Sequence, residues 1–151
     1  MTHDDVRAVF ADAVPEIWDG VIEIMAIAGV PGEHLKVGLR SRESWLDPVG
    51  ATMGMGGRRI LPILQRIGGV IDLTAWPEAL EARLAGALRP CFATIEPGDP
   101  IRLHDVTYGY AAVAPEDVDA RVALHVRLAG ELLGVALEQV GPARAQPGGL
   151  G

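Results

Sequence analysis

The sequence contains few aromatic residues, a single cysteine and no long apolar segment. Aromatic residues account for 5% of the 151 residues and hydrophobic residues for 49%, so a core must be built mainly from aliphatic side chains. The one cysteine, Cys91, excludes an internal disulfide or a cysteine-rich zinc site, and we expect it to be buried. No apolar run reaches the roughly 18 residues of a membrane span, and the polar N-terminus does not resemble a secretory signal. These absences favour a soluble cytoplasmic protein without a membrane partner.

Positive charge is scarce as well. The chain has 13 Lys and Arg residues against 20 Asp and Glu residues, a formal net charge of −7 and a pI near 5.0, which disfavours a general polyanion binder. Residues 33–66 differ, because they hold six basic and three acidic residues and so carry a local charge of +3. Any contact with nucleic acid would therefore come from the basic residues of this segment: Lys36, Arg40, Arg42, Arg58, Arg59 and Arg66.

The length allows one domain or two very small ones. Glycine and proline number 19 and 11, which implies many turns and short elements. Hydrophobic spacing predicts, in the first half, a helix to about Ala13, strands over 21–28 and 35–40, helices over 49–53 and 58–67, and a strand over 70–74. In the second half it predicts a helix over 77–88, strands over 92–95 and 106–113, a helix over 117–133 and a strand over 135–140. We expect the Pro/Gly/Ala-rich tail, residues 141–151, to be disordered.

A glycine loop, Gly54-Met55-Gly56-Gly57, lies between the two short helices of the first half. The preceding helix begins at Asp47-Pro48, where aspartate caps and proline suits the first helical position. Glycines allow positive φ and a close approach of backbone to ligand, and the helix that follows turns its free N–H groups toward the loop. This is the KH arrangement, in which such a loop clamps the backbone of about four nucleotides. On pattern alone, a glycine-rich connector without a ligand is an equal alternative.

Other chemistry finds no support in the sequence. A P-loop needs Gly-Lys-Ser/Thr after four spacers, which is absent, and a dinucleotide fingerprint starting at Gly54 would need glycine where Arg59 stands. The four histidines show no metal-ligand spacing, and no arrangement typical of nucleophilic catalysis is present. We therefore expect no catalytic residues, no metal and no cofactor.

The two halves share a repeated pattern. Residues 66–73 align with residues 131–138, in each case the end of an aliphatic helix, a glycine stop and a strand. The first copy is longer, since 22 positions separate Asp47 from Gly69 and 17 separate Asp117 from Gly134. The five missing positions match the glycine loop, so the second half is predicted to be a shortened copy. Chance similarity between two leucine-rich helices followed by strands is the alternative.

These segments resemble a known family. Residues 14–24 resemble the beginning of the tandem KH region of the bacterial transcription factor NusA. The most specific similarity lies in DPVGA at 47–51, GMGGRRI at 54–60 and GGVIDLTAW at 68–76. A looser similarity to the second KH domain of that family continues to about residue 140.

The resemblance implies an α+β fold of two prokaryotic-type (type II) KH domains in tandem, each a three-stranded sheet covered by helices on one face. Residues 1–76 would form the first domain, and residues 77–140 a second, degenerate domain without the loop. The family binds single-stranded RNA emerging from RNA polymerase and acts in pausing, termination and antitermination. The implied partners are single-stranded RNA and, beyond it, RNA polymerase or other transcription factors. The residues predicted to contact RNA are Gly54, Met55, Gly56, Gly57, Arg58, Arg59, Lys36, Arg40 and Arg66.

The chain also departs from the family pattern. It has Gly56 where the family often has a basic residue, Gly29 where the family has arginine, and no second loop. Each lost cation removes a phosphate contact, so we expect weak to moderate RNA affinity. A KH-fold module that binds proteins and has lost most RNA binding is the alternative function. Trp45, just before Asp47, is expected to pack in or at the rim of the core, with stacking on a base as the alternative.

Overall fold

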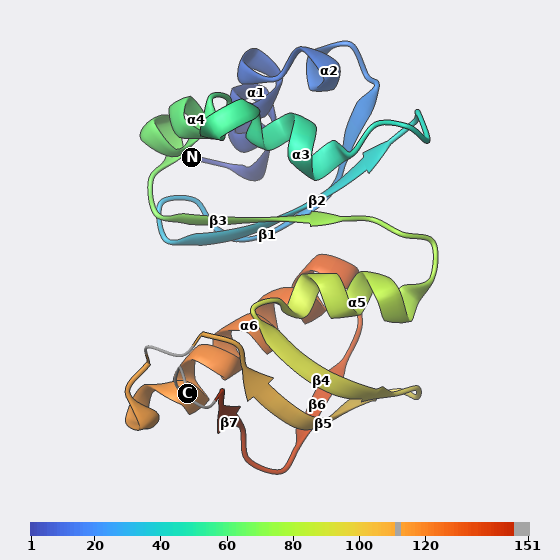
Figure 1. Ribbon diagram of the computed structural model, residues 1–151, viewed down its shortest axis with the longest axis vertical. Coiled ribbons are helices and arrows are strands. Elements are labelled where there is room, and N and C mark those ends of the chain that lie inside the picture. The colour runs from blue at the N-terminus through green and yellow to red at the C-terminus, as the bar shows by residue number, and fades with distance from the viewer. Residues whose placement is uncertain (111–112, 147–151) are drawn as a thin grey trace. The chain divides into compact units, whose positions relative to one another are not determined.

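The computed structural model describes residues 1–110 and 113–146, and the chain divides into two compact units, Met1–Glu78 and Ala79–Gly151 (Figure 1). Each unit combines helices with a small mixed sheet, as the predicted α+β class requires. Within the described part of the chain, every helix is too short or too polar to cross a bilayer.

The first unit contains the predicted helices and strands around one three-stranded sheet. Its strand order is β1-β2-β3, with β1 and β2 antiparallel and β2 and β3 parallel. The helices α1, α3 and α4 lie on the same face of this sheet (Figure 1). The bounds are α1 (His3–Ala13), α2 (Pro15–Trp18), β1 (Ile22–Val30), β2 (His34–Ser41), α3 (Pro48–Met53), a 3-10 turn η1 (Met55–Gly57), α4 (Ile60–Ile67) and β3 (Val70–Ala75).

Local hydrogen bonds explain where the helices begin. Thr2 caps α1 in a capping box: the Asp5 N–H donates to Thr2 Oγ1 at 3.1 Å, and the Thr2 N–H donates to Asp5 Oδ2 at 2.7 Å. Asp47 caps α3 as predicted, accepting at Oδ1 from the Val49 N–H at 3.1 Å, with Pro48 in the first turn. The turn expected after Ala13 is the short helix α2, which starts at Pro15.

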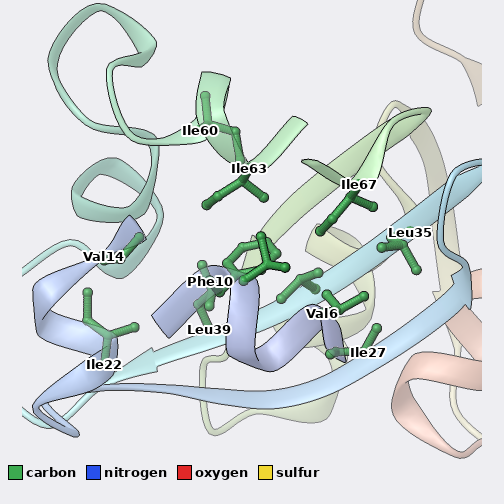
Figure 2. Packing of buried hydrophobic residues seen from close by; sticks show 12 residues of the cluster. Val6, Phe10, Val14, Ile22, Ile27, Leu35, Leu39, Ile60, Ile63 and Ile67 are labelled. Carbon is green, nitrogen blue, oxygen red and sulfur yellow. The ribbon is translucent and has the colours of Figure 1, made fainter. Parts of the chain in front are cut away.

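The core of the first unit is aliphatic except for Phe10. Figure 2 shows Val6 and Phe10 of α1 packed between Leu35 and Leu39 of β2 and the isoleucines of α4. Phe10, Leu35, Leu39 and Ile63 are fully buried. On the opposite face of β2, the Trp76 ring lies directly over Gly38, so a side chain at Gly38 has no room. The sheet, with its central strand buried on both faces, is the platform that supports α3 and α4.

The second unit repeats part of this order. A helix is followed by two antiparallel strands, a longer helix and a strand parallel to the second of them. It has no counterpart of α3 among its described residues. The bounds are α5 (Leu80–Leu88), β4 (Cys91–Glu96), β5 (Ile101–Tyr108), a 3-10 turn η2 (Pro115–Asp117), α6 (Val118–Leu133), β6 (Leu137–Val140) and β7 (Arg144–Ala145). Cys91 is buried, as predicted.

Four predictions for the second unit are wrong at their boundaries. The helix expected over 77–88 is α5, which begins at Leu80, with Ala79 still in an extended conformation at its N-cap. The strand expected over 106–113 is β5, which begins at Ile101 because Ile101 and Leu103 alternate with outward polar residues; residues 111–112 lie outside the described part. The strand expected from 135 starts at Leu137, since the Val135 N–H still donates to the Gly130 carbonyl at 3.1 Å. Within the tail expected to be disordered, β7 pairs with β5, whereas residues 147–151 lie outside the described part.

Gly69 offers a test of the connection between α4 and β3. Its φ is +70°, and a Cβ there would lie 2.5 Å from the Glu33 carbonyl oxygen and 2.6 Å from the Gly32 carbonyl carbon. We expect Gly69→Ala to lower the free energy of unfolding by about 2–4 kcal/mol, because the clash is with backbone as well as with the left-handed conformation. Denaturant unfolding of the whole chain measures this effect.

Gly20→Ala is the matched control. Gly20 has φ +81°, but a Cβ there would meet nothing within 4 Å. Gly20→Ala should lower the free energy of unfolding by only about 1 kcal/mol, the cost of the left-handed backbone conformation for alanine. Equal losses for the two variants would show that the approach of Gly69 to Gly32 and Glu33 carries no energetic weight.

Candidate nucleic-acid interface

The glycine loop is shaped by three residues with positive φ. Gly54 has φ +75°, Gly56 +64° and Gly57 +79°, conformations that other residue types adopt only at a cost. The turn is closed by backbone bonds from the Gly57 N–H to the Gly54 carbonyl at 3.1 Å and from the Arg58 N–H to the Met55 carbonyl at 3.3 Å. The N–H groups of Met55 and Gly56 donate to no backbone carbonyl among the described residues. The loop therefore offers two backbone donors to a ligand.

The tip of the loop is open to solvent. Met55 is 88% exposed, and a Cβ built on Gly56 would meet nothing within 4 Å. Helix α4 starts three residues after Gly57, so the positive end of its dipole lies next to the same donors. Leu61, which is also exposed, lies beside Gly57, with its Cγ 3.7 Å from the position of a Gly57 Cβ. Backbone donors, a helix N-terminus and exposed apolar side chains thus meet at one place.

The two arginines after the loop differ in their roles. Arg59 is half-buried and donates from Nη1 both to the Glu16 carboxylate and to the Ala51 carbonyl, the latter at 2.9 Å. Its backbone nitrogen would lie 2.8 Å from a Cβ on Gly54, so it packs tightly under the loop. Arg58 is exposed and makes no ion pair within the described part of the chain. Arg59 therefore ties the loop to α2 and α3, while Arg58 is the cation available to a phosphate.

The other predicted cations are not gathered at the loop. Lys36 is 1% exposed on β2, with its Nζ 3.1 Å from Asp72 Oδ2 on β3, so the structure does not bring it to the surface. Arg40 pairs with Glu23 and Arg66 pairs with Asp12, each at 3.2 Å. Both pairs are exposed, and such surface pairs contribute little and exchange easily. Arg40 and Arg66 thus remain accessible to a polyanion, whereas Lys36 has a structural role.

Asp72 and Glu16 are the supporting residues that sequence reasoning missed. Asp72 accepts from His34 Nε2 at 2.7 Å as well as from Lys36. Burial by itself raises the pKa of Asp72, but the hydrogen bond from His34 and the charge and hydrogen bond of Lys36 outweigh it and hold this pKa below its ordinary value of 3.8. The signal that could have revealed the role of Asp72 is the parallel register of β2 and β3, which pairs His34 with Val70 and Lys36 with Asp72. This register is known only once the two strands are aligned.

The described residues of the second unit include no glycine loop before their long helix, α6. Between β5 and α6 the chain has only residues 109–117, too few for a second α3 and a glycine loop. The first turn of α6 and the turn before it carry Glu116, Asp117 and Asp119. These carboxylates interact favourably with the positive end of the α6 dipole, but they would repel a phosphate.

The expectation that Trp45 packs in or at the rim of the core is wrong. Its side chain, between β2 and α3, is 78% exposed. The adjacent Leu46 takes the inward position and packs against the core.

The order of elements in the first unit, its mixed sheet and its loop of glycines between two short helices define a KH-type domain. Residues 2–76 match the family model described as the NusA-like first KH domain. The chain therefore contains a NusA-like KH region.

Named relatives agree with this assignment. The chain is 34% identical over 91 residues to the transcription termination/antitermination protein NusA of Halalkalibacterium halodurans, a match that covers 59% of this chain and 24% of that protein. It is 30% identical over 155 residues to the protein of the same name in Mycobacterium tuberculosis, covering 98% of this chain and 43% of the relative. The chain thus spans less than half the length of these relatives.

A solved structure shows the same fold over nearly the whole chain. The crystal structure of APE1850 aligns with a TM-score of 0.53 at 16% sequence identity, covering 97% of this chain and 100% of the other. At this identity the likeness concerns the fold alone.

The pair of half-buried Asp72 and buried Lys36 predicts a pH-dependent stability. Because the pKa of Asp72 is lowered in the folded chain, its contribution is present above about pH 4 and is lost as the pH falls through the folded-state pKa. We expect Asp72→Asn to lower the free energy of unfolding at pH 7 by about 1–3 kcal/mol, since it weakens a partner of a buried ammonium. The difference from the unchanged chain should shrink as the pH drops below about 4.

Denaturant unfolding at pH 7 and at pH 3 measures both effects. Asp12→Asn is the matched control, because Asp12 forms an exposed pair with Arg66; its effect should stay below about 0.5 kcal/mol. If Asp72→Asn lowered the free energy of unfolding equally at pH 7 and at pH 3, the stabilising role of the ionised Asp72 carboxylate would be contradicted.

Proposed function

We propose that this chain binds single-stranded RNA through the loop Gly54–Gly57, as a non-enzymatic module acting in transcription elongation, termination or antitermination. The observation that carries the proposal is the exposed loop itself, with positive φ at three glycines and two N–H groups that donate to no carbonyl of the described backbone, beside the start of α4. The relatives named NusA support the link to transcription.

The loop has what a phosphate needs. The N–H groups of Met55 and Gly56 can donate to phosphate oxygens, and without a side chain at Gly56 the RNA backbone can approach closely. Arg58 supplies one exposed positive charge next to them. The exposed apolar side chains of Met55 and Leu61 offer contact to the bases. In KH domains a clamp of this kind holds about four nucleotides.

The electrostatics favour weak to moderate affinity with a clear salt dependence. The chain carries a net charge of −7, and of the loop arginines Arg59 is already paired with Glu16. Each phosphate contact in single-stranded RNA contributes about 0.7 to the slope of log K against log salt concentration. We expect a small slope, set by Arg58 and by those surface arginines that exchange their carboxylate partners for phosphate.

We further propose that the second unit is a degenerate KH copy, with residues 1–76 as the first domain and 77–140 as the second. Its element order supports this, because helix, two antiparallel strands, helix and parallel strand recur in both units. With Glu116, Asp117 and Asp119 where the loop and helix start would be, its described residues offer no phosphate clamp.

A protein-interaction module is the second candidate function. It is favoured by the net charge and by the acidic turn that replaces the second loop. RNA polymerase or another transcription factor would then be the partner. Capture of such a protein from extract after nuclease treatment, by a chain that does not bind RNA, would support this candidate over the first.

Gly56→Asp tests the clamp. Aspartate and asparagine tolerate positive φ better than most residues, and Gly56 has open space around it, so the fold should survive either substitution. We expect Gly56→Asp to weaken RNA binding by roughly tenfold or more, because it places a negative charge among the phosphate donors. Fluorescence anisotropy with a labelled single-stranded RNA measures the affinity.

The matched control is Gly56→Asn, which has the same shape without the charge. It should keep affinity within about threefold of the unchanged chain. RNA binding that is unaffected by Gly56→Asp would remove the loop from the binding site.

Arg58 and Arg59 form a second matched pair of variants. We expect Arg58→Ala to lower RNA affinity by about three- to tenfold and the salt slope by about 0.7, with no change in stability. Arg59→Ala should instead lower the free energy of unfolding by about 1–2 kcal/mol, because it breaks the bonds to Glu16 and Ala51. Anisotropy at two salt concentrations, together with thermal unfolding, separates the two. If Arg59→Ala changed only the salt slope, the division of roles would be overturned.

A further inference from the structure

Trp45 is the most exposed tryptophan of the chain and lies outside the glycine loop. With 78% of its surface accessible, it leaves one of the largest apolar side chains in water. It stands in the segment between β2 and α3, which projects from the first unit (Figure 1). Exposing such a ring forgoes the free energy that its burial would contribute. A ring held out in this way is therefore a candidate for contact with a ligand.

The backbone around Trp45 is firmly held. The Arg42 N–H donates to the Val21 carbonyl at 2.9 Å, and the Leu46 N–H donates to the Glu43 carbonyl at 3.1 Å, which closes a turn with Trp45 inside it. Ser41 Oγ donates to the Glu43 carbonyl at 2.9 Å, which fixes the start of the turn. On the other side, Leu46 packs into the core and Asp47 caps α3. The ring is thus presented by an ordered turn, and a ligand that stacks on it would not have to order the chain first.

Two arginines stand close to this turn in the chain, with one carboxylate between them. Arg40 and Arg42 both reach Glu23 Oε1, at 3.2 and 3.1 Å. One carboxylate thus serves two guanidinium groups, while the carboxylates of Glu43 and Asp47 on the same segment balance their charge, so the turn has no surplus of positive charge. Proteins that bind single-stranded nucleic acids combine exposed aromatic rings, on which bases stack, with arginines that contact phosphates.

The turn is joined to the glycine loop by a single short helix. α3 runs from Pro48 to Met53, six residues or about 9 Å of helix, with Trp45 before its first turn and the loop after its last. A strand that is clamped at Gly54–Gly57 and continues along α3 would reach the ring of Trp45. The observations favour RNA over a protein at this place because the turn leads through α3 directly to the glycine loop and because two arginines that share one carboxylate precede the ring in the chain.

We propose that Trp45 is a base-stacking platform that extends the RNA site beyond the nucleotides held by the loop, with Arg40 and Arg42 binding the adjoining phosphates. This proposal rests on the proposed RNA-binding function. It predicts that the chain prefers RNA longer than the four nucleotides of a KH clamp. Stacking of one base on an aromatic side chain is worth about 1–3 kcal/mol, which corresponds to a change of about fivefold or more in affinity.

The experiment compares Trp45→Ala with the unchanged chain on labelled single-stranded RNAs of four and ten nucleotides. We expect Trp45→Ala to weaken binding of the ten-nucleotide RNA by at least fivefold and to leave the four-nucleotide RNA unaffected. Trp45→Phe keeps a ring and should restore most of the affinity. Phe92→Ala is the control, since it removes a 50% exposed ring from the second unit and should change neither affinity.

The outcomes separate this proposal from the loop clamp. If Gly56→Asp weakens both RNAs and Trp45→Ala weakens neither, or weakens both equally, the platform is overturned and the clamp stands. If Trp45→Ala acts on the long RNA but Gly56→Asp has no effect, the clamp is overturned and the platform stands. If Trp45→Ala leaves RNA binding intact but abolishes capture of RNA polymerase, the ring is a protein contact and the platform is overturned.

Discussion

The turn between α3 and α4 is the constraint on which the functional surface depends. Within four residues the chain adopts positive φ three times, at Gly54, Gly56 and Gly57. Side chains at these positions would strain the backbone, and at Gly54 they would also collide with Arg59. Because the glycines accept this path, the N–H groups of Met55 and Gly56 donate to no backbone carbonyl within the described part of the chain, and both residues lie at the exposed tip of the loop. The same path places the start of α4 beside them, so geometry and electrostatics favour one kind of ligand, a phosphate.

The charged residues of the first unit divide into supporting and surface groups. Arg59 with Glu16 holds the loop on α2 and α3, and Lys36 with Asp72 joins β2 to β3. These residues shape the proposed site from below, and the loss of a partner is costly above all for Lys36, which is buried. Arg58 and the other exposed arginines are the cations that a polyanion can reach from solvent. A count of basic residues therefore overstates the charge that is available for RNA.

Much of this could be predicted from the sequence because the deciding signals are local. Asp47-Pro48, the glycines of the loop and Gly68-Gly69 each determine a cap or a turn within a few residues, and the structure has each helix boundary close to its predicted place. The burial of Lys36 and the exposure of Trp45 could not be predicted in this way. Lys36 becomes internal only when β2 pairs with β3, and Trp45 is exposed because Leu46, its neighbour, takes the core position. Both depend on contacts between distant segments, which spacing along the chain does not report.

The most direct test of the central claim is an NMR titration of the isotope-labelled chain with a short single-stranded RNA, following the backbone amide signals. We expect the amides of Met55 and Gly56 to show the largest shifts, with those at the start of α4 next, and the shifts to diminish as salt is added. Shifts confined to the second unit, or a loop whose amide signals do not move while RNA binds, would contradict it.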